Sequence, residues 1–249
     1  MKIAVIGGGH GCHAAAADLS EQGHEVRLWR RDAAALGAIK NNGAIRLIDA
    51  AGSRSLPLHL VTTDVSEAVA GAQMVLSPLP ATAQESIAGI IAPYLSDGQV
   101  VAIPPGTLGA VAMSRIIRRT GNRADLAFVE SGTLPYLARL RENDLVAISA
   151  RATRLPSGVY PARLSEHGLA VSGSVFPAIE PLVDVLDAVL MNAGPIIHPP
   201  LILMNAGPME HFDTWDIHNE GTQPAIRAVT DALDQERIAI RKAVDYGPP

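Results

Sequence analysis

The chain opens on a short glycine turn between a segment that favours a strand and a segment that favours a helix. Residues 2–6 form a mainly apolar, β-branched run, which indicates a buried strand, and the alanines at 14–17 are strong helix formers. Cys12 takes the last small-residue position of a G-x-G-x-x-G pattern. In this context backbone N–H groups can approach a pyrophosphate at a helix N-terminus. The sequence therefore predicts a dinucleotide site formed by Gly7, Gly9, His10 and Gly11.

The residues that follow the second expected strand bear on which dinucleotide binds. Residues 25–29 are expected to be that strand, and Arg30 and Arg31 come next. An NAD site usually carries an acid here for the ribose hydroxyls, whereas a guanidinium pairs with a 2′-phosphate. We therefore expect NADP as the cofactor, with Arg30 as the phosphate ligand. NAD stays open, because Asp32 could instead reach the ribose while both arginines are solvated.

Strands and helices continue to alternate along the chain. This order predicts an α/β fold with a doubly wound, mostly parallel Rossmann-type sheet, whose ligands bind at the carboxyl ends of the strands. Pro78, Pro105 and Glu130 follow expected strands and are assigned to the cofactor site. We expect a dinucleotide-binding domain over 1–180 and a helical domain, part of a larger one, over 181–249. The further strands are expected at 58–62, 73–77, 99–103, 126–129 and 145–149.

Composition limits the partners. The net charge of −5, without a basic block, argues against nucleic acid, and a single cysteine excludes an internal disulfide. No signal-like N-terminus or 18-residue apolar run is present, so we expect a cytoplasmic protein without a membrane segment. His10 and His13 lie in the phosphate turn without acid or thiol ligands around them, and we expect no metal. The sequence leaves the oligomeric state open, with a homodimer as one option.

Several blocks resemble the NAD(P)-dependent opine dehydrogenases of the octopine and nopaline type. The resemblance implies an enzyme that reduces the imine formed from an α-keto acid and an amino acid, with hydride from a nicotinamide. Beyond the glycine turn, the matching blocks are Pro105-Gly106-Thr107-x-Gly109, Glu130-Ser131-x-Thr133, Arg139, Asn192-Ala193, His198-Pro199, Leu203-Met204-Asn205-Ala206, Glu220-Gly221-x-x-Pro224 and Leu233-Asp234-x-Glu236-Arg237.

The resemblance also implies the substrate site. His198 is the expected general acid, because an imidazole titrates near neutrality. The alternative is a buried histidine bonded to a carbonyl. Asn192 and Asn205 are expected to line the substrate site as amide donors, unless they cap helices. Arg139 suits a substrate carboxylate, unless it is a surface charge.

The chain differs from the family pattern in one respect that bears on its catalytic activity. The resemblance implies that relatives continue beyond the point matching Pro249, and that their catalytic aspartate lies in that stretch, so the activity of this chain is left open. Two further hypotheses about the function remain. A ketopantoate-like reductase of 2-keto acids is disfavoured, because its usual catalytic lysine has no counterpart between Lys40 and Lys242. A non-catalytic NADP-binding protein would bind the cofactor without turnover.

Overall fold

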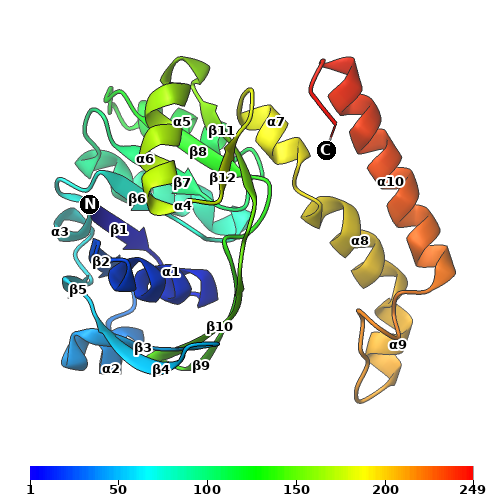
Figure 1. The fold of residues 1–249 in the computed structure, drawn as a ribbon, viewed down its shortest axis with the longest axis horizontal. Helices are drawn as coiled ribbons and strands as arrows, with labels where there is room; N and C mark the ends of the chain where they lie inside the picture. The colour runs from blue at the N-terminus through cyan, green and yellow to red at the C-terminus, as the bar shows by residue number, and fades with distance from the viewer. Residues whose placement is uncertain (249) are drawn as a thin grey trace. The chain divides into compact units, whose positions relative to one another are not determined.

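The computed structural model describes residues 1–248 and divides into two compact units, Met1–Val189 and Leu190–Pro249. The first unit is built on an eight-stranded sheet in the order β12-β11-β8-β7-β6-β1-β2-β5 (Figure 1). All neighbouring pairs are parallel except β11 with β8, which confirms the predicted doubly wound α/β class. The strands are β1 (Lys2–Ile6), β2 (Glu25–Trp29), β5 (Leu60–Thr62), β6 (Met74–Leu76), β7 (Val100–Ile103), β8 (Ala127–Ser131), β11 (Leu155–Tyr160) and β12 (Ile179–Pro181).

Helices cover both faces of this sheet. In β1, Ile3 and Val5 belong to one apolar cluster, and Ala4 and Ile6 to the other. A parallel strand buried on both faces reads as a continuous apolar run, as residues 3–6 do. The first cluster includes α1 (His10–Glu21) and α6 (Ser165–Val175), and the second includes α3 (Val65–Val69), α4 (Ala81–Ile91) and α5 (Gly109–Arg119).

A second sheet of four strands packs on α1. Its order is β4-β3-β10-β9, with β3 and β10 parallel and the outer pairs antiparallel. The prediction that 145–149 would continue the main series is therefore wrong. Along β9, buried Tyr136 and Ala138 alternate with exposed Leu137 and Arg139, as expected for a sheet with one solvated face. The elements are α2 (Ala33–Asn42), β3 (Ala44–Asp49), β4 (Gly52–Pro57), β9 (Tyr136–Glu142) and β10 (Leu145–Arg151).

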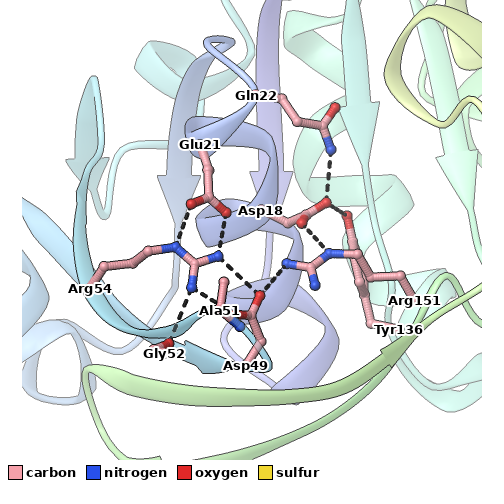
Figure 2. A network of polar contacts seen from close by, with 9 residues as sticks. All are labelled: Asp18, Glu21, Gln22, Asp49, Ala51, Gly52, Arg54, Tyr136 and Arg151. Carbon is pink, nitrogen blue, oxygen red and sulfur yellow. Dashed lines mark hydrogen bonds and ion pairs between the residues drawn. The ribbon is translucent and has the colours of Figure 1, made fainter.

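A network of charged side chains joins α1 to this small sheet (Figure 2). Buried Asp18 accepts from Arg151 Nε at 2.6 Å, and Arg151 also donates to Asp49 at 2.8 Å. Arg54 bridges Asp49 and Glu21 and, with Arg151, holds the pKa of Asp49 well below its usual range. Because each buried carboxylate has a guanidinium partner, the network fixes the sheet to the helix that begins at the glycine turn.

The second unit is helical. It contains α8 (Gly194–Met204), α9 (Ala206–His211) and α10 (Pro224–Ala243), and α7 (Val185–Leu190) precedes α8. Helix α10 packs against α8, where Leu201 and Ile226 are buried. The spatial division thus follows Val189, whereas the sequence-based boundary was placed at 180/181.

One stretch of the described chain, residues 185–204, has the length and mean hydropathy (1.3) of a membrane-crossing helix. In the structure it is interrupted between α7 and α8, and 33% of it is buried. Length and hydropathy alone do not identify a membrane span, because a core helix of a soluble protein passes the same test.

Candidate active site

The turn after β1 requires glycine at its first position. Gly7 has φ of +123°, and a Cβ there would lie 2.6 Å from Leu79 Cδ2 and 2.9 Å from Cys12 Sγ. Its N–H donates to Trp29 O at 2.9 Å, which ties the turn to the end of β2. A Cβ at Gly11 would lie 3.3 Å from Pro78 Cβ, so the proline after β6 packs against the start of α1.

The N-terminus of α1 is open to an anion. Gly9 is its exposed, extended N-cap, no side chain caps the helix, and a Cβ on Gly9 would meet nothing within 4 Å. Burial raises the pKa of the Cys12 thiol to about 11, so this side chain in the first turn stays neutral. An uncapped helix start without acidic residues favours a phosphate group. The residues present therefore fit the pyrophosphate of a dinucleotide.

A cleft of about 420 Å³ lies beside this turn, between β2 and α4, and both arginines line it. Arg30 lies flat against the turn, so that a Cβ on Gly8 would overlap it, and its Nη1 is 3.5 Å from Gly8 O. Arg31 Nη2 donates to Ser86 Oγ at 3.0 Å. Within residues 1–248 neither guanidinium has an acidic partner. The sequence analysis did not predict Ser86 as a site residue, because no motif marks this position.

Asp32 has a different role from a ribose ligand in this structure. Its Oδ1 accepts from Ala34 N at 2.9 Å and from Ala35 N at 3.3 Å, and it is the N-cap of α2. A carboxylate that already caps a helix is less available to ribose hydroxyls. The placement favours the reading in which the arginines face the adenosine end of the cofactor.

Glu130 is hydrogen-bonded to the backbone of the turn that begins α5. It is fully buried at the end of β8, and its carboxylate accepts from Leu108 N at 3.1 Å and from Ala110 N. Burial raises its pKa to about 7, although the backbone N–H groups oppose the shift. Leu108, with φ of +64°, is the N-cap of α5 and caps nothing through its own side chain. Glu130 therefore holds the segment that follows Pro105, and its role in cofactor binding remains a prediction.

His10 is hydrogen-bonded to β9, the strand that carries Arg139. His10 Nδ1 accepts from Leu140 N at 2.7 Å, which fixes one ring nitrogen and leaves Nε2 as the donor. Arg139 is the neighbouring residue on β9 and is exposed, with its Nη1 on Ala138 O at 3.0 Å. In the described chain, no group of three or more His, Cys, Asp or Glu side chains forms a metal site.

The two asparagines belong to the second unit and are both buried. Asn192 Oδ1 accepts from Gly194 N at 2.9 Å, at the start of α8. Asn205 Nδ2 donates to Leu201 O at 2.7 Å and to Gly221 O at 3.1 Å. Both amide hydrogens of Asn205 are therefore used inside the protein. This favours the alternative that Asn205 caps a helix over a role as a hydrogen-bond donor to the substrate.

His198 differs from the asparagines in being exposed on α8. The alternative of a buried histidine bonded to a carbonyl is therefore wrong. A Cβ placed on Gly194 would lie 3.0 Å from Asn192 Oδ1 and 3.6 Å from His198 Nδ1, so the two side chains approach the same point. Thus the structure groups Asn192 with His198, while Gly7, Gly9, Gly11, Arg30 and Pro78 gather at the carboxyl edge of the main sheet.

Comparison with known proteins assigns the family. A model described as the alpha-helical domain of NAD/NADP octopine/nopaline dehydrogenase matches residues 181–249, and one described as the N-terminus of NAD-dependent glycerol-3-phosphate dehydrogenase matches 2–120. The opine dehydrogenase of Arthrobacter sp. (strain 1C) is 31% identical over 246 residues, covering 99% of this chain and 68% of that protein. The chain belongs to the opine dehydrogenase family. This confirms the resemblance and identifies the chain as an NAD(P)-dependent oxidoreductase by descent.

Solved structures share the fold. An octopine dehydrogenase in complex with NADH and agmatine has a TM-score of 0.75 at 20% identity, over 98% of this chain and 64% of that one. Yersinopine dehydrogenase with NADP⁺ bound has a TM-score of 0.78 at 16% identity, over 97% of this chain and 64% of that one. The chain thus spans somewhat less than two thirds of the length of these two dehydrogenases.

Proposed function

We propose that this protein reduces the imine formed between an α-keto acid and an amino acid, as a cytoplasmic enzyme acting on small molecules. The observation that carries the proposal is the 31% identity to an opine dehydrogenase along 99% of the chain. Both the nucleotide half and the helical segment are included in that match, and the helical segment also matches the family model of the octopine/nopaline dehydrogenase helical domain. Family membership favours this reaction over reduction of a 2-keto acid without an amine.

The reaction converts C=N into CH–NH and needs one hydride for carbon and one proton for nitrogen. When bound, the nicotinamide supplies the hydride. His198 supplies the proton to the nitrogen, since its exposed imidazole forms no hydrogen bond within the described chain that would hold it elsewhere. Asn192, which approaches the same point from the start of α8, orients the imidazole or the substrate beside it.

The cofactor is NADPH rather than NADH in this proposal. Gly7, Gly9 and the open start of α1 receive the pyrophosphate, and Arg30 and Arg31 receive the 2′-phosphate. Ser86 adds a hydroxyl donor next to Arg31. The support is the pair of guanidinium groups in the cleft without an acidic partner among residues 1–248.

The test is a panel of NADPH oxidation assays. Pyruvate, oxaloacetate and 2-oxoglutarate are each combined with the standard amino acids, and ketopantoate is assayed without an amine. Oxidation that requires both a keto acid and an amino acid supports the proposal. Oxidation with a keto acid alone selects the ketopantoate-like reading. NADPH binding by fluorescence titration with no turnover in any mixture selects a non-catalytic binding protein and rejects the proposed reaction.

A further inference from the structure

A second pocket lies at the edge of the main sheet opposite to the glycine turn. Helix α5 follows β7, so it begins at the carboxyl edge of the parallel strands and ends at their amino edge. There residues of its last turns line the pocket together with residues of β8, where Phe128 pairs in register with Tyr160 of β11. The pocket has a volume of about 290 Å³ and is lined by Ser114, Arg115, Ile117, Arg118, Arg119, Leu126, Phe128, Tyr160 and Pro161.

The floor of this pocket is apolar. Ile117, Leu126 and Phe128 are all buried members of the core cluster on this face of the sheet. Tyr160 is half-buried beside them, and its hydroxyl has no hydrogen-bond partner within residues 1–248. A flat or apolar group can therefore be covered here, next to a hydroxyl able to donate or accept.

The rim of the pocket is strongly basic. Arg115, Arg118 and Arg119 occupy positions i, i+3 and i+4 of α5, so they share one side of the helix. None of the three forms an ion pair in the part of the chain that the structure describes, although the charge of Arg118 helps to lower the pKa of Asp125. The neighbouring acid is Asp125, and both its oxygens are bound by Arg163, with Nη1 on Oδ2 at 2.9 Å.

Compensation of the helix dipole explains only part of this cluster. Arg118 and Arg119 lie in the last turn of α5, where cations are favourable. Arg115 lies one turn earlier, yet it lines the same hollow. Three guanidinium groups around an apolar floor have the composition of a ligand site, because a pocket for an organic molecule combines an apolar lining with a few polar groups that fix orientation.

We propose that this pocket binds an organic anion, with a carboxylate or phosphate held by the arginines and a flat apolar body lying on Ile117, Phe128 and Tyr160. Guanidinium groups bind both oxyanions in bidentate geometry, which makes arginine suited to this position. The site is separate from the cofactor cleft, which lies at the carboxyl edge of β1 and β2. It does not depend on the proposed reaction.

The experiment uses phenyl phosphate and benzoate as probes in isothermal titration calorimetry, with NADPH present at saturation to fill the cofactor cleft. Both probes are expected to bind at one site per chain, and inorganic phosphate, which lacks the apolar body, more weakly. Arg115→Gln and Arg118→Gln should each weaken the binding of phenyl phosphate by about tenfold or more, since each removes a charge-assisted hydrogen bond. Arg141→Gln, an exposed arginine on β9, is the control matched for charge and should leave affinity unchanged.

Tyr160→Leu provides a second test through the floor of the pocket. It should weaken phenyl phosphate binding while leaving inorganic phosphate binding nearly the same, because only the former uses the ring contact. Absence of binding by both organic probes, or equal affinity in wild type and all arginine variants, overturns the proposal. A poly-glutamate peptide that binds in an Arg115-dependent manner, while the small probes do not, would instead make this face a site for an acidic protein.

Discussion

The two units differ in where they keep their apolar side chains. In Met1–Val189, alternate residues of the central strands enter one of two clusters, and large side chains such as Leu19 and Leu28 are fully buried. In the described part of the second unit, the buried apolar residues are Pro200, Leu201 and Ile226. Many others there are exposed: Ile197, Ile202, Leu203, Met204, Met209, Phe212, Val229, Ile238, Ile240 and Val244.

This difference predicts that the two units have separate roles in cofactor binding and in catalysis. A unit with its own dense core can hold a cofactor site at fixed geometry, because packed interiors deform little. A unit with few buried contacts contributes little to global stability, so substitutions in it act mainly on chemistry. The proposed proton donor lies in the second unit, and the proposed nucleotide ligands lie in the first. Stability, nucleotide affinity and turnover should therefore separate when residues of each unit are changed.

The largest expected effect is on turnover. His198→Asn should lower kcat by about 10²- to 10⁴-fold, because it removes the proposed proton donor. NADPH affinity should stay within a factor of about two, well below the tenfold that 1.4 kcal/mol would produce. Stopped-flow NADPH oxidation and nucleotide fluorescence titration measure the two quantities. His167→Asn, which changes an exposed histidine of the first unit, is the matched control. A wild-type rate in His198→Asn would show that another group delivers the proton.

A core substitution should then separate the stabilities of the two units. Leu19→Ala, in the first unit, should lower the free energy of unfolding by about 2–5 kcal/mol, as for other fully buried leucines. Leu203→Ala, at a side chain that is 74% exposed, should change it by less than about 0.5 kcal/mol.

The two tryptophans of the chain make this comparison measurable. Trp29 is in β2, and Trp215 donates from Nε1 to Asn205 in the second unit. Urea unfolding of Leu19→Ala is followed by Trp29 fluorescence in a Trp215→Phe background, and that of Leu203→Ala by Trp215 in a Trp29→Phe background. Similar losses for both leucine substitutions would remove the distinction between a densely packed unit and a sparsely packed one.

A contrast between local and long-range contacts explains which features of the fold could be predicted from the sequence. The strand, glycine turn and helix at 2–21 lie within one local segment, and their pattern predicted them correctly. The small sheet depends on pairs far apart in sequence, such as Asp18 with Arg151 and Arg46 with Asp144. Nothing local to 145–149 indicates a partner at 46–48, so the strand was assigned to the wrong sheet.

Side-chain roles were less predictable than elements. Glu130 was expected just after a strand but lies within the last residues of β8, and its burial and its bonds to Leu108 N and Ala110 N arise from the folded turn. Asn205 matched a family position, yet its amide is used by Leu201 and Gly221. Ser86 carries no motif and is found only because α4 brings it to Arg31. Spacing locates a residue, whereas its available hydrogen-bonding groups depend on tertiary contacts.

A smaller effect is expected from pH, and it belongs to the first unit. The folded protein raises the pKa of Glu130 from 4.5 to about 7, so it binds this proton more tightly than the unfolded chain. The Glu130 contribution to stability is therefore full below about pH 4.5 and is lost as pH rises to about 7. Glu130→Gln, which cannot ionise, should flatten this part of the profile by about 1–3 kcal/mol.

The measurement is urea unfolding at intervals between pH 4.5 and 7.5, followed by Trp29 fluorescence in the Trp215→Phe background. Glu166→Gln, an exposed residue of α6, is the control and should keep the slope of the parent protein. If Glu130→Gln retains the full slope, the carboxyl is not the group that titrates in this window. The bonds to the α5 turn would then be formed by a carboxylate with an ordinary pKa.

The smallest expected effect is the preference between cofactors. Wild type should bind NADPH about five- to tenfold more tightly than NADH, the size expected for a solvent-accessible ion pair with a phosphate. Arg30→Ala and Arg31→Ala should each reduce this ratio, and Ser86→Ala should reduce it less, because it removes a neutral donor. Since all three residues line the cleft of the first unit, kcat at saturating NADPH should stay nearly constant. Equal affinities of wild type for NADPH and NADH would indicate instead that Asp32 binds the adenosine ribose and that NAD is the cofactor. A preference that survives both arginine substitutions would mean that the 2′-phosphate is recognised by groups outside this cleft.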